Sequence, residues 1–208
     1  MKAKVIFFDA ANTLLYKPDL YPAIVNVMLQ HGVTVPYTKL LASHRLLSEV
    51  IPFPDRTSSG FYRDFNSHLV RSFGVPPTEK LLDEIFSACS YLPWCPFPDT
   101  DHLTSIPLPM GVLSNWDKSL PEKLALIANT RFEWIIGSED YQVRKPDLDF
   151  FKKIFHITGL KAEEIIYVGD SMRLDIEPAL HLGMNVLLLD RDDYYSVRPF
   201  RESRASGR

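Results

Sequence analysis

Five short, unbroken apolar runs along the chain predict buried β-strands. They span residues 5–8, 110–113, 134–136, 165–168 and 186–189. Apolar runs that do not alternate with polar residues are typical of strands covered on both faces, as in parallel sheets. Between the later runs, Leu148, Phe151 and Phe155 recur at helical spacing with Lys152 on the opposite side. Strands that alternate with helices predict an α/β fold with a doubly wound, Rossmann-like parallel sheet.

Residues 18–92 carry a different pattern, with four successive helical repeats and no strand between them. The third repeat is the clearest, because its aromatic and aliphatic residues are spaced four apart: Phe61, Phe65, Leu69 and Phe73. The fourth repeat runs from Leu81 to Leu92, and glycines and prolines separate the segments. We therefore expect an all-helical cap domain (18–92) inserted into an α/β core domain (1–17 and 93–208), with the proline-rich stretch 93–98 as the return linker.

Composition excludes several classes of function. A length of 208 residues leaves room for one large domain or one domain with an insertion. The chain has 23 Lys and Arg against 26 Asp and Glu, a net charge of −3, so it lacks the field that attracts nucleic acid or an anionic membrane. No run approaches the ~20 apolar residues of a membrane span, and the apolar run before Asp9 is too short for a signal peptide.

The cysteines and the C-terminal residues add two smaller expectations. Cys89 and Cys95 predict reduced, partly buried thiols, since two cysteines make no disulfide framework. The tail after Asp190 predicts a frayed, solvated terminus with four arginines: Arg198, Arg201, Arg204 and Arg208. We expect a cytoplasmic protein that binds neither nucleic acid nor membrane; the sequence does not reveal its oligomeric state.

Polar residues follow the predicted strands at the points where ligands bind in open parallel sheets. Asp9 and Thr13 follow the first run, and Ser114 and Asn115 follow the second. Lys145 comes in the loop after the third. Asp170, Ser171 and Asp175 follow the fourth. Any one of these residues alone is explained by a helix cap or a surface loop. Their occurrence in order, each after or near a buried strand, indicates a common site.

Phosphoryl transfer is the chemistry that this set of residues shares. A carboxylate can attack phosphorus and form an aspartyl-phosphate. Two carboxylates and a main-chain carbonyl can hold Mg²⁺, which binds phosphate oxygens. A lysine and a serine hydroxyl can neutralise and hydrogen-bond the remaining oxygens.

Four segments of the chain resemble the motifs of the haloacid dehalogenase (HAD) superfamily, whose members are mostly phosphatases. They are Phe-Phe-Asp-Ala-Ala-Asn-Thr-Leu at 7–14, Val-Leu-Ser-Asn at 112–115, Arg-Lys-Pro-Asp at 144–147, and Val-Gly-Asp-Ser at 168–171 with Asp175 beyond it. The resemblance covers residues 4–16 and about 98–190. The helical stretch 18–92 lies where the family places its C1 cap.

The resemblance also implies roles for single residues and a small phosphorylated substrate. Asp9 would be the nucleophile, with Ser114 and Lys145 as the other catalytic residues. Thr13, Ser114, Asn115 and Lys145 would bind the phosphate. Asp9, the carbonyl of Ala11 and Asp170 would bind Mg²⁺, and Ser171 and Asp175 would support the metal shell or Lys145.

The first motif departs from the family pattern at two positions. The family's phosphatases usually carry a second Asp two residues after the nucleophile, which protonates the leaving group and activates water; here that residue is Ala11. General acid–base help is worth ~10²–10⁴ in rate, so its loss sets a ceiling on activity rather than proving inactivity. The following glycine is replaced by Asn12, which tolerates left-handed backbone angles.

Three interpretations remain open at this point. The first is a Mg²⁺-dependent phosphatase that acts on a good leaving group or takes its acid–base group from water or the cap. Cap candidates are Lys39, His44, Arg45 and His68, each of which we expect on a solvated helix face. The second is a phosphonatase-type C–P hydrolase with a cap lysine such as Lys39; dehalogenase-type members lack the metal aspartate, so Asp170 argues against them. The third is a non-catalytic descendant that binds phosphate or a partner.

Overall fold

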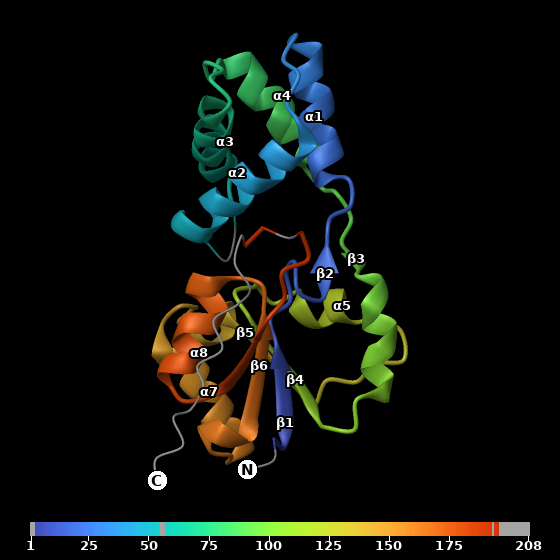
Figure 1. Ribbon diagram of the computed structural model, residues 1–208, viewed down its shortest axis with the longest axis vertical. Helices are drawn as coiled ribbons and strands as arrows, with labels where there is room; N and C mark the ends of the chain where they lie inside the picture. The colour runs from blue at the N-terminus through green and yellow to red at the C-terminus, as the bar shows by residue number, and fades with distance from the viewer. Residues whose placement is uncertain (1–2, 55–56, 193, 196–208) are drawn as a thin grey trace.

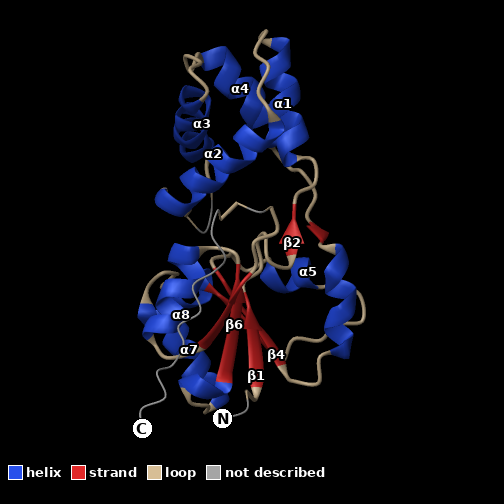
Figure 2. Cartoon of the chain, viewed as in Figure 1, coloured by secondary structure: helices blue, strands red, loops and turns tan. Residues whose placement is uncertain are grey.

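A five-stranded parallel sheet forms the centre of the core. The computed structural model describes residues 3–54, 57–192 and 194–195. The strands lie in the order β5–β4–β1–β6–β7, and every neighbouring pair is parallel (Figures 1 and 2). Their bounds are Val5–Phe8 (β1), Met110–Ser114 (β4), Trp134–Gly137 (β5), Ile165–Gly169 (β6) and Asn185–Leu188 (β7). The predicted α/β fold and its five strands are confirmed.

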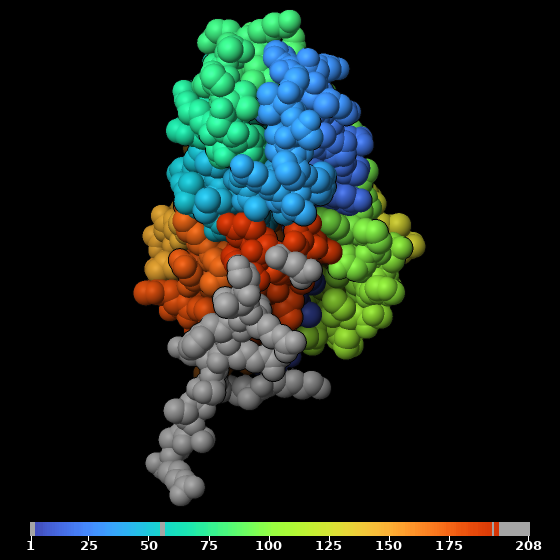
Figure 3. Space-filling model, turned by 45° about the horizontal axis from the view of Figure 1, so that its top comes forward, coloured from blue at the N-terminus to red at the C-terminus, as the bar shows by residue number. Residues whose placement is uncertain are grey.

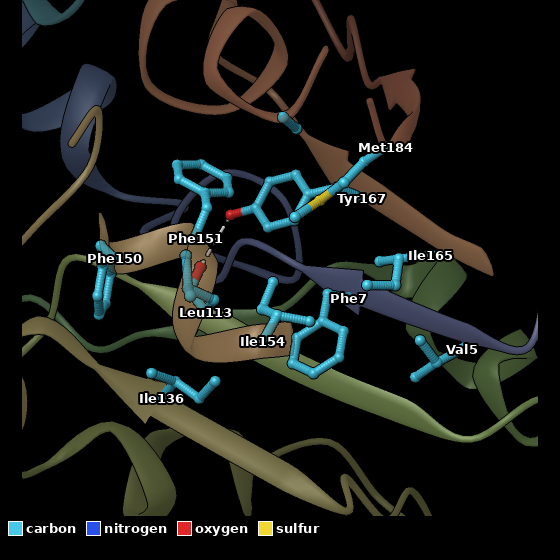
Figure 4. Close-up of a cluster of buried hydrophobic side chains, with 11 residues drawn as sticks. Val5, Phe7, Leu113, Ile136, Phe150, Phe151, Ile154, Ile165, Tyr167 and Met184 are labelled. Atoms are coloured by element: carbon cyan, nitrogen blue, oxygen red, sulfur yellow. Dashed lines mark hydrogen bonds between the residues drawn. The ribbon is translucent and has the colours of Figure 1, made fainter. Parts of the chain in front are cut away.

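Both faces of the central strand are buried, which explains its unbroken apolar sequence. Val5 and Phe7 pack on one side with α7 (Leu148–Thr158) and α8 (Glu177–His181), in the cluster shown in Figure 4. Phe8 packs on the other side, against α5 (Leu120–Leu124) and the 3₁₀ segment η1 (Pro98–Ser105). Successive strand residues point to opposite faces, so a strand between two helical layers needs apolar residues at every position.

The helical insert follows the first strand. Its four helices are α1 (Leu20–Gln30), α2 (Tyr37–Val50), α3 (Ser59–Ser72) and α4 (Glu79–Cys89). They enclose an apolar cluster of their own, and they lie over the carboxyl ends of the sheet strands in Figure 1. We call α1–α4 the cap. No helix among the described residues has the length and apolar content needed to cross a bilayer.

The fourth cap helix ends earlier than its apolar pattern indicates. The chain turns extended at Ser90, whose hydroxyl donates to the carbonyl of Phe86, and Tyr91 has a left-handed φ of 59°. The helix therefore ends at Cys89, although the apolar spacing of the side chains continues to Leu92.

The two crossings between core and cap are paired as a small antiparallel ribbon. Leu15–Tyr16 (β2) pairs with Cys95–Pro96 (β3), and the rings of Tyr16 and Phe97 stack with centroids 4.2 Å apart. The return linker is therefore partly strand. Three short elements complete the core: α6 (Ser138–Tyr141), η2 (Ala162–Glu164) and the π-helical turn η3 (Met172–Ile176).

The residues directly after β7 pack against the protein, so the expectation of a solvated terminus is wrong for them. The Arg191 guanidinium donates to the Thr13 carbonyl (2.6 Å), pairs with Asp99 (3.1 Å) and lies 3.7 Å from the ring centre of Phe97. The Tyr195 hydroxyl donates to Glu49 of the cap helix α2 (3.2 Å). The segment shows no apolar periodicity, so the sequence does not predict these contacts. The four arginines from Arg198 to Arg208 lie outside the described residues.

Candidate active site

The residues expected at the strand ends meet at the carboxyl edge of the sheet. Asp9 follows β1, Ser114 ends β4 and Asp170 follows β6. Asp9, Asp170 and Asp175 are all buried, and each offers a carboxylate oxygen within 4.8 Å of the others. The parallel topology explains this meeting, because it brings the carboxyl ends of neighbouring strands to one edge.

Lys145 lies between two of the three carboxylates. Its ammonium donates to Oδ1 of Asp9 (2.5 Å) and to Oδ1 of Asp175 (2.7 Å), and the side chain is only 3% exposed. Burial alone would lower the pKa of Lys145, but the negative charges of Asp175 and Asp9 outweigh burial and hold the pKa above its ordinary value. The lysine is therefore a fixed positive charge beside Asp9.

Two hydroxyl groups complete the set of donors around the acids. The Ser114 hydroxyl donates to Oδ1 of Asp9 (3.0 Å), and the Thr13 hydroxyl donates to Oδ1 of Asp170 (3.3 Å). Both side chains are buried. Ser114 and Thr13 thus lie beside the carboxylates as the sequence leads us to expect.

The side chain of Asn115 contacts the main chain of Lys145, and its role as a phosphate ligand stays a prediction. Its amide nitrogen donates to the carbonyl of Lys145 (3.0 Å), and its amide oxygen accepts from the main-chain N–H of Lys145 (2.8 Å). Both polar ends of the side chain are engaged with that one residue. Asn115 consequently fixes the loop from which the Lys145 side chain reaches Asp9.

Asp175 is held from several directions by neighbouring core residues. Its Oδ2 accepts from the Ser171 main-chain N–H (3.1 Å), and its Oδ1 accepts from the Tyr167 hydroxyl (3.3 Å) as well as from Lys145. Tyr167 also donates to the carbonyl of Leu113 (2.9 Å; Figure 4). Sequence reasoning missed Tyr167; its one signal was a hydroxyl-bearing residue inside an otherwise aliphatic run.

Gly169 is a glycine because Asp175 packs against its Cα. An added Cβ at this position would lie 2.5 Å from Oδ2 of Asp175, well inside van der Waals contact. We expect Gly169→Ala to lower the free energy of unfolding by about 1–3 kcal/mol, as overpacked positions do. Urea denaturation measures this loss. Gly60→Ala is the matched control, because the nearest atom there is 3.7 Å away and the residue lies in helix α3; an equal loss in both variants would contradict this account of Gly169.

The loop after Asp9 keeps its turn without the usual glycine. Asn12 has a left-handed φ of 59°, as expected, and its N–H donates to the carbonyl of Leu15 (2.6 Å). Ala11 is partly exposed in this turn. The loop shape is therefore retained, while the Ala11 methyl group supplies no proton donor or acceptor.

Arg45 lies in the site, which corrects the expectation that it occupies a solvated face. From α2 its guanidinium donates to Oδ2 of Asp170 and to the main-chain carbonyl of Asp170. The side chain is only 13% exposed. This contact depends on how the cap is oriented over the core. The helical pattern of α2 alone therefore does not predict it.

The other cap candidates have different surroundings. Lys39 is exposed with its ammonium 5.9 Å from the ring centre of Phe73, and His68 is exposed on α3. His44 is half-buried between the rings of Tyr21 and Phe65, and burial, with a smaller effect of Arg45, lowers its pKa to about 4. A neutral His44 packed among cap aromatics is a structural residue.

The acidic cluster has the chemistry of a divalent-cation site. Burial raises the pKa values of Asp170 and Asp175, opposed by Arg45 and Lys145 respectively, and the neighbouring acids add to the rise. Three buried carboxylates face Lys145 and Arg45, so one negative charge remains uncompensated, and carboxylate oxygens are the ligands that Mg²⁺ prefers. Asp9 and Asp170 therefore offer carboxylate ligands that fit such a cation, with Asp175 beside them.

Comparison with known proteins agrees with this geometry. Residues 102–189, which include Ser114, Lys145, Asp170 and Asp175, match the family described as haloacid dehalogenase-like hydrolase. A glyceraldehyde 3-phosphate phosphatase of Methanocaldococcus jannaschii is 35% identical over 109 residues, which cover 48% of this chain and 46% of that protein. The family match relates residues 102–189 of the chain to the haloacid dehalogenase-like hydrolases. The family expected from the motifs is confirmed.

Further HAD proteins resemble the chain over different lengths. The haloacid dehalogenase-like hydrolase domain-containing protein 3 of Danio rerio is 32% identical, over 55% of this chain and 50% of that protein. The chain thus spans about half the length of the first two relatives. A glyceraldehyde 3-phosphate phosphatase of Methanothermobacter thermautotrophicus is 27% identical over 91% of this chain and 86% of that protein. The structure of the HAD-hydrolase YfnB from Bacillus subtilis, bound to magnesium, superposes with a TM-score of 0.60 at 16% identity, covering 91% of this chain and 89% of YfnB, and so shares the fold.

Proposed function

We propose that this protein is a Mg²⁺-dependent phosphatase that hydrolyses a small phosphorylated metabolite through an aspartyl-phosphate on Asp9. The observation that carries the proposal is the buried Asp9 carboxylate with Lys145 and Ser114 on one oxygen and two further acids beside it. The names of the archaeal relatives, glyceraldehyde 3-phosphate phosphatases, support the same reaction class. Residues 1–17 and 93–208 would form the catalytic core, with 18–92 as the cap domain.

The geometry gives each side chain a part in two displacement steps. Among the described residues, the hydrogen bonds to the Asp9 carboxylate converge on Oδ1, which leaves Oδ2 as the attacking atom. Asp9 forms a bond to phosphorus as the ester oxygen leaves with its electron pair, and water then cleaves the aspartyl-phosphate to restore Asp9. Lys145 and the Ser114 and Thr13 hydroxyls stabilise the phosphoryl oxygens. Mg²⁺, held by Asp9, Asp170 and the Ala11 carbonyl, would supply charge neutralisation when bound.

The remaining residues of the site act by positioning. Asn115 holds the main chain of Lys145, and Asp175 holds its ammonium group opposite Asp9. Ser171 donates its main-chain N–H to Asp175. These contacts keep Lys145 in one orientation before substrate arrives, which lowers the reorganisation that the transition state requires.

A panel of phosphorylated metabolites, assayed for phosphate release with Mg²⁺ and with a chelator, tests the proposal. Turnover on at least one member that disappears with the chelator is the expected result. Silence across the panel would favour a protein that binds phosphate or a partner without catalysis. Release of phosphate from phosphonoacetaldehyde alone would favour the phosphonatase-type reaction; Lys39, the lysine considered for it, lies with its ammonium 5.9 Å from the ring centre of Phe73 in the cap.

Restoring a carboxylate at the position of Ala11 is expected to raise the rate on poor leaving groups. An alkoxide needs a proton as it departs and an aryl oxide does not, so Ala11→Asp should accelerate hydrolysis of an alkyl phosphate by about 10²–10⁴ and of an aryl phosphate far less. Steady-state kcat/KM on the two esters measures the difference. Ala11→Asn is the matched control, because its amide has similar size and no acidic proton. Equal gains on both esters would show that leaving-group protonation is not the deficit.

A further inference from the structure

We propose that Arg45 is an internal competitor for the divalent cation, so that cation binding displaces its guanidinium from Asp170 and loosens the cap. This inference rests on the metal site of the proposed function. It adds a connection between that site and helix α2, which carries Arg45.

The contacts of Asp170 leave no carboxylate oxygen without a partner from this chain. Arg45 donates to Oδ2 and to the main-chain carbonyl, and Thr13 donates to Oδ1 (3.3 Å). A cation that binds Oδ2 requires the space that the guanidinium fills. Arg45 and a cation ligated by Oδ2 are therefore alternatives at Asp170.

The charges of the cluster lead to the same conclusion. The carboxylates of Asp9, Asp170 and Asp175 face the positive charge of Lys145, and two negative charges remain. One divalent cation compensates both of them. Arg45 compensates one, so it stabilises the acids without a metal, and a metal makes its charge redundant.

Helix α2 connects this exchange to the position of the cap. One turn after Arg45, Glu49 accepts from the Ser171 hydroxyl (2.9 Å) and from the Arg173 main-chain N–H (3.2 Å). The Tyr195 hydroxyl also donates to Glu49 (3.2 Å). Figure 3 shows this junction, where the red residues after β7 lie between the cyan part of the cap and the orange core. Arg45 and Glu49 share one face of α2, and the Arg173 guanidinium donates to the Glu49 carbonyl, so losing the Arg45 pair removes one of several contacts that hold this helix to the core.

Calorimetric titration with Mg²⁺ tests the competition on the full chain. We expect Arg45→Gln to bind Mg²⁺ roughly tenfold more tightly than the wild type, within the usual range of coupling between linked sites. Arg45→Lys keeps the positive charge but not the two-pronged contact, so its Mg²⁺ affinity should lie between those of the wild type and Arg45→Gln. Arg63→Gln is the matched control, because Arg63 pairs with Glu79 and Asp83 inside the cap; its affinity should equal that of the wild type.

Amide hydrogen exchange of residues 37–50 provides the second readout. Mg²⁺ should increase exchange there in the wild type, whereas Arg45→Gln should exchange faster already and change little. Equal or weaker Mg²⁺ affinity in Arg45→Gln would overturn the competition while leaving the metal site intact. If neither protein binds Mg²⁺ above the level of Asp170→Asn, the metal site and the competition are both refuted.

Discussion

Replacing Asp9 with asparagine is expected to reduce phosphatase turnover by at least ~10⁴-fold, the scale on which removal of an attacking residue acts. The amide keeps an oxygen that accepts from Lys145 and Ser114, so the fold should persist while the proposed nucleophile is lost. Initial rates on an aryl phosphate, with circular dichroism to confirm folding, measure the effect. Mass spectrometry of acid-quenched protein should show a phosphoryl group on wild-type Asp9 and none on the variant.

A matched acid on the surface controls for the change of charge. Asp149 lies exposed in the first turn of α7 and pairs with Lys152. Asp149→Asn should keep the wild-type rate, since exposed pairs contribute little. Turnover that survives in Asp9→Asn would mean that another group attacks phosphorus, and the covalent mechanism would have to be abandoned.

Replacing Lys145 with methionine is expected to lower the free energy of unfolding by about 3–5 kcal/mol in the absence of divalent cations. Methionine preserves much of the side-chain volume, but it leaves the carboxylates of Asp9 and Asp175 buried without their shared cation. If Mg²⁺ binds the folded state as proposed, adding it should recover part of the loss. Urea denaturation with and without Mg²⁺ measures both quantities.

Lys152→Met provides the comparison on the surface of α7. Lys152 is 46% exposed and pairs with Asp149, so its loss should change the free energy of unfolding by no more than about 0.5 kcal/mol. Similar losses in the two variants would show that the Lys145 pairs add nothing beyond ordinary surface contacts.

Local patterns in the sequence predict most of the fold and much of the candidate site. The apolar run of β1 indicates a strand buried on both faces, and the topology of parallel strands then places Asp9 beside Ser114 and Asp170. Such inferences need only periodicity and the rule that ligands bind at the carboxyl edge.

The contacts that escaped prediction depend on how distant elements are oriented. Arg45 has the same local pattern as a solvated helical residue, and only the docking of the cap places it against Asp170. Arg191 and Tyr195 follow the last strand in a segment without periodicity, so nothing in the sequence joins them to Thr13 or Glu49. The two-residue strands β2 and β3 are too short to produce any pattern.

The strand order has a consequence for the way the chain folds as it is synthesised. β1 is central, and its neighbours are β4, which begins at Met110, and β6, which begins at Ile165. At ~5–20 residues per second, the ribosome exposes β1 for several seconds before either neighbour exists. The cap helices, whose apolar cluster is complete within their own segment, emerge in that interval. The cap can thus form first, while the apolar strand β1 stays unpaired until β4 and β6 have been synthesised.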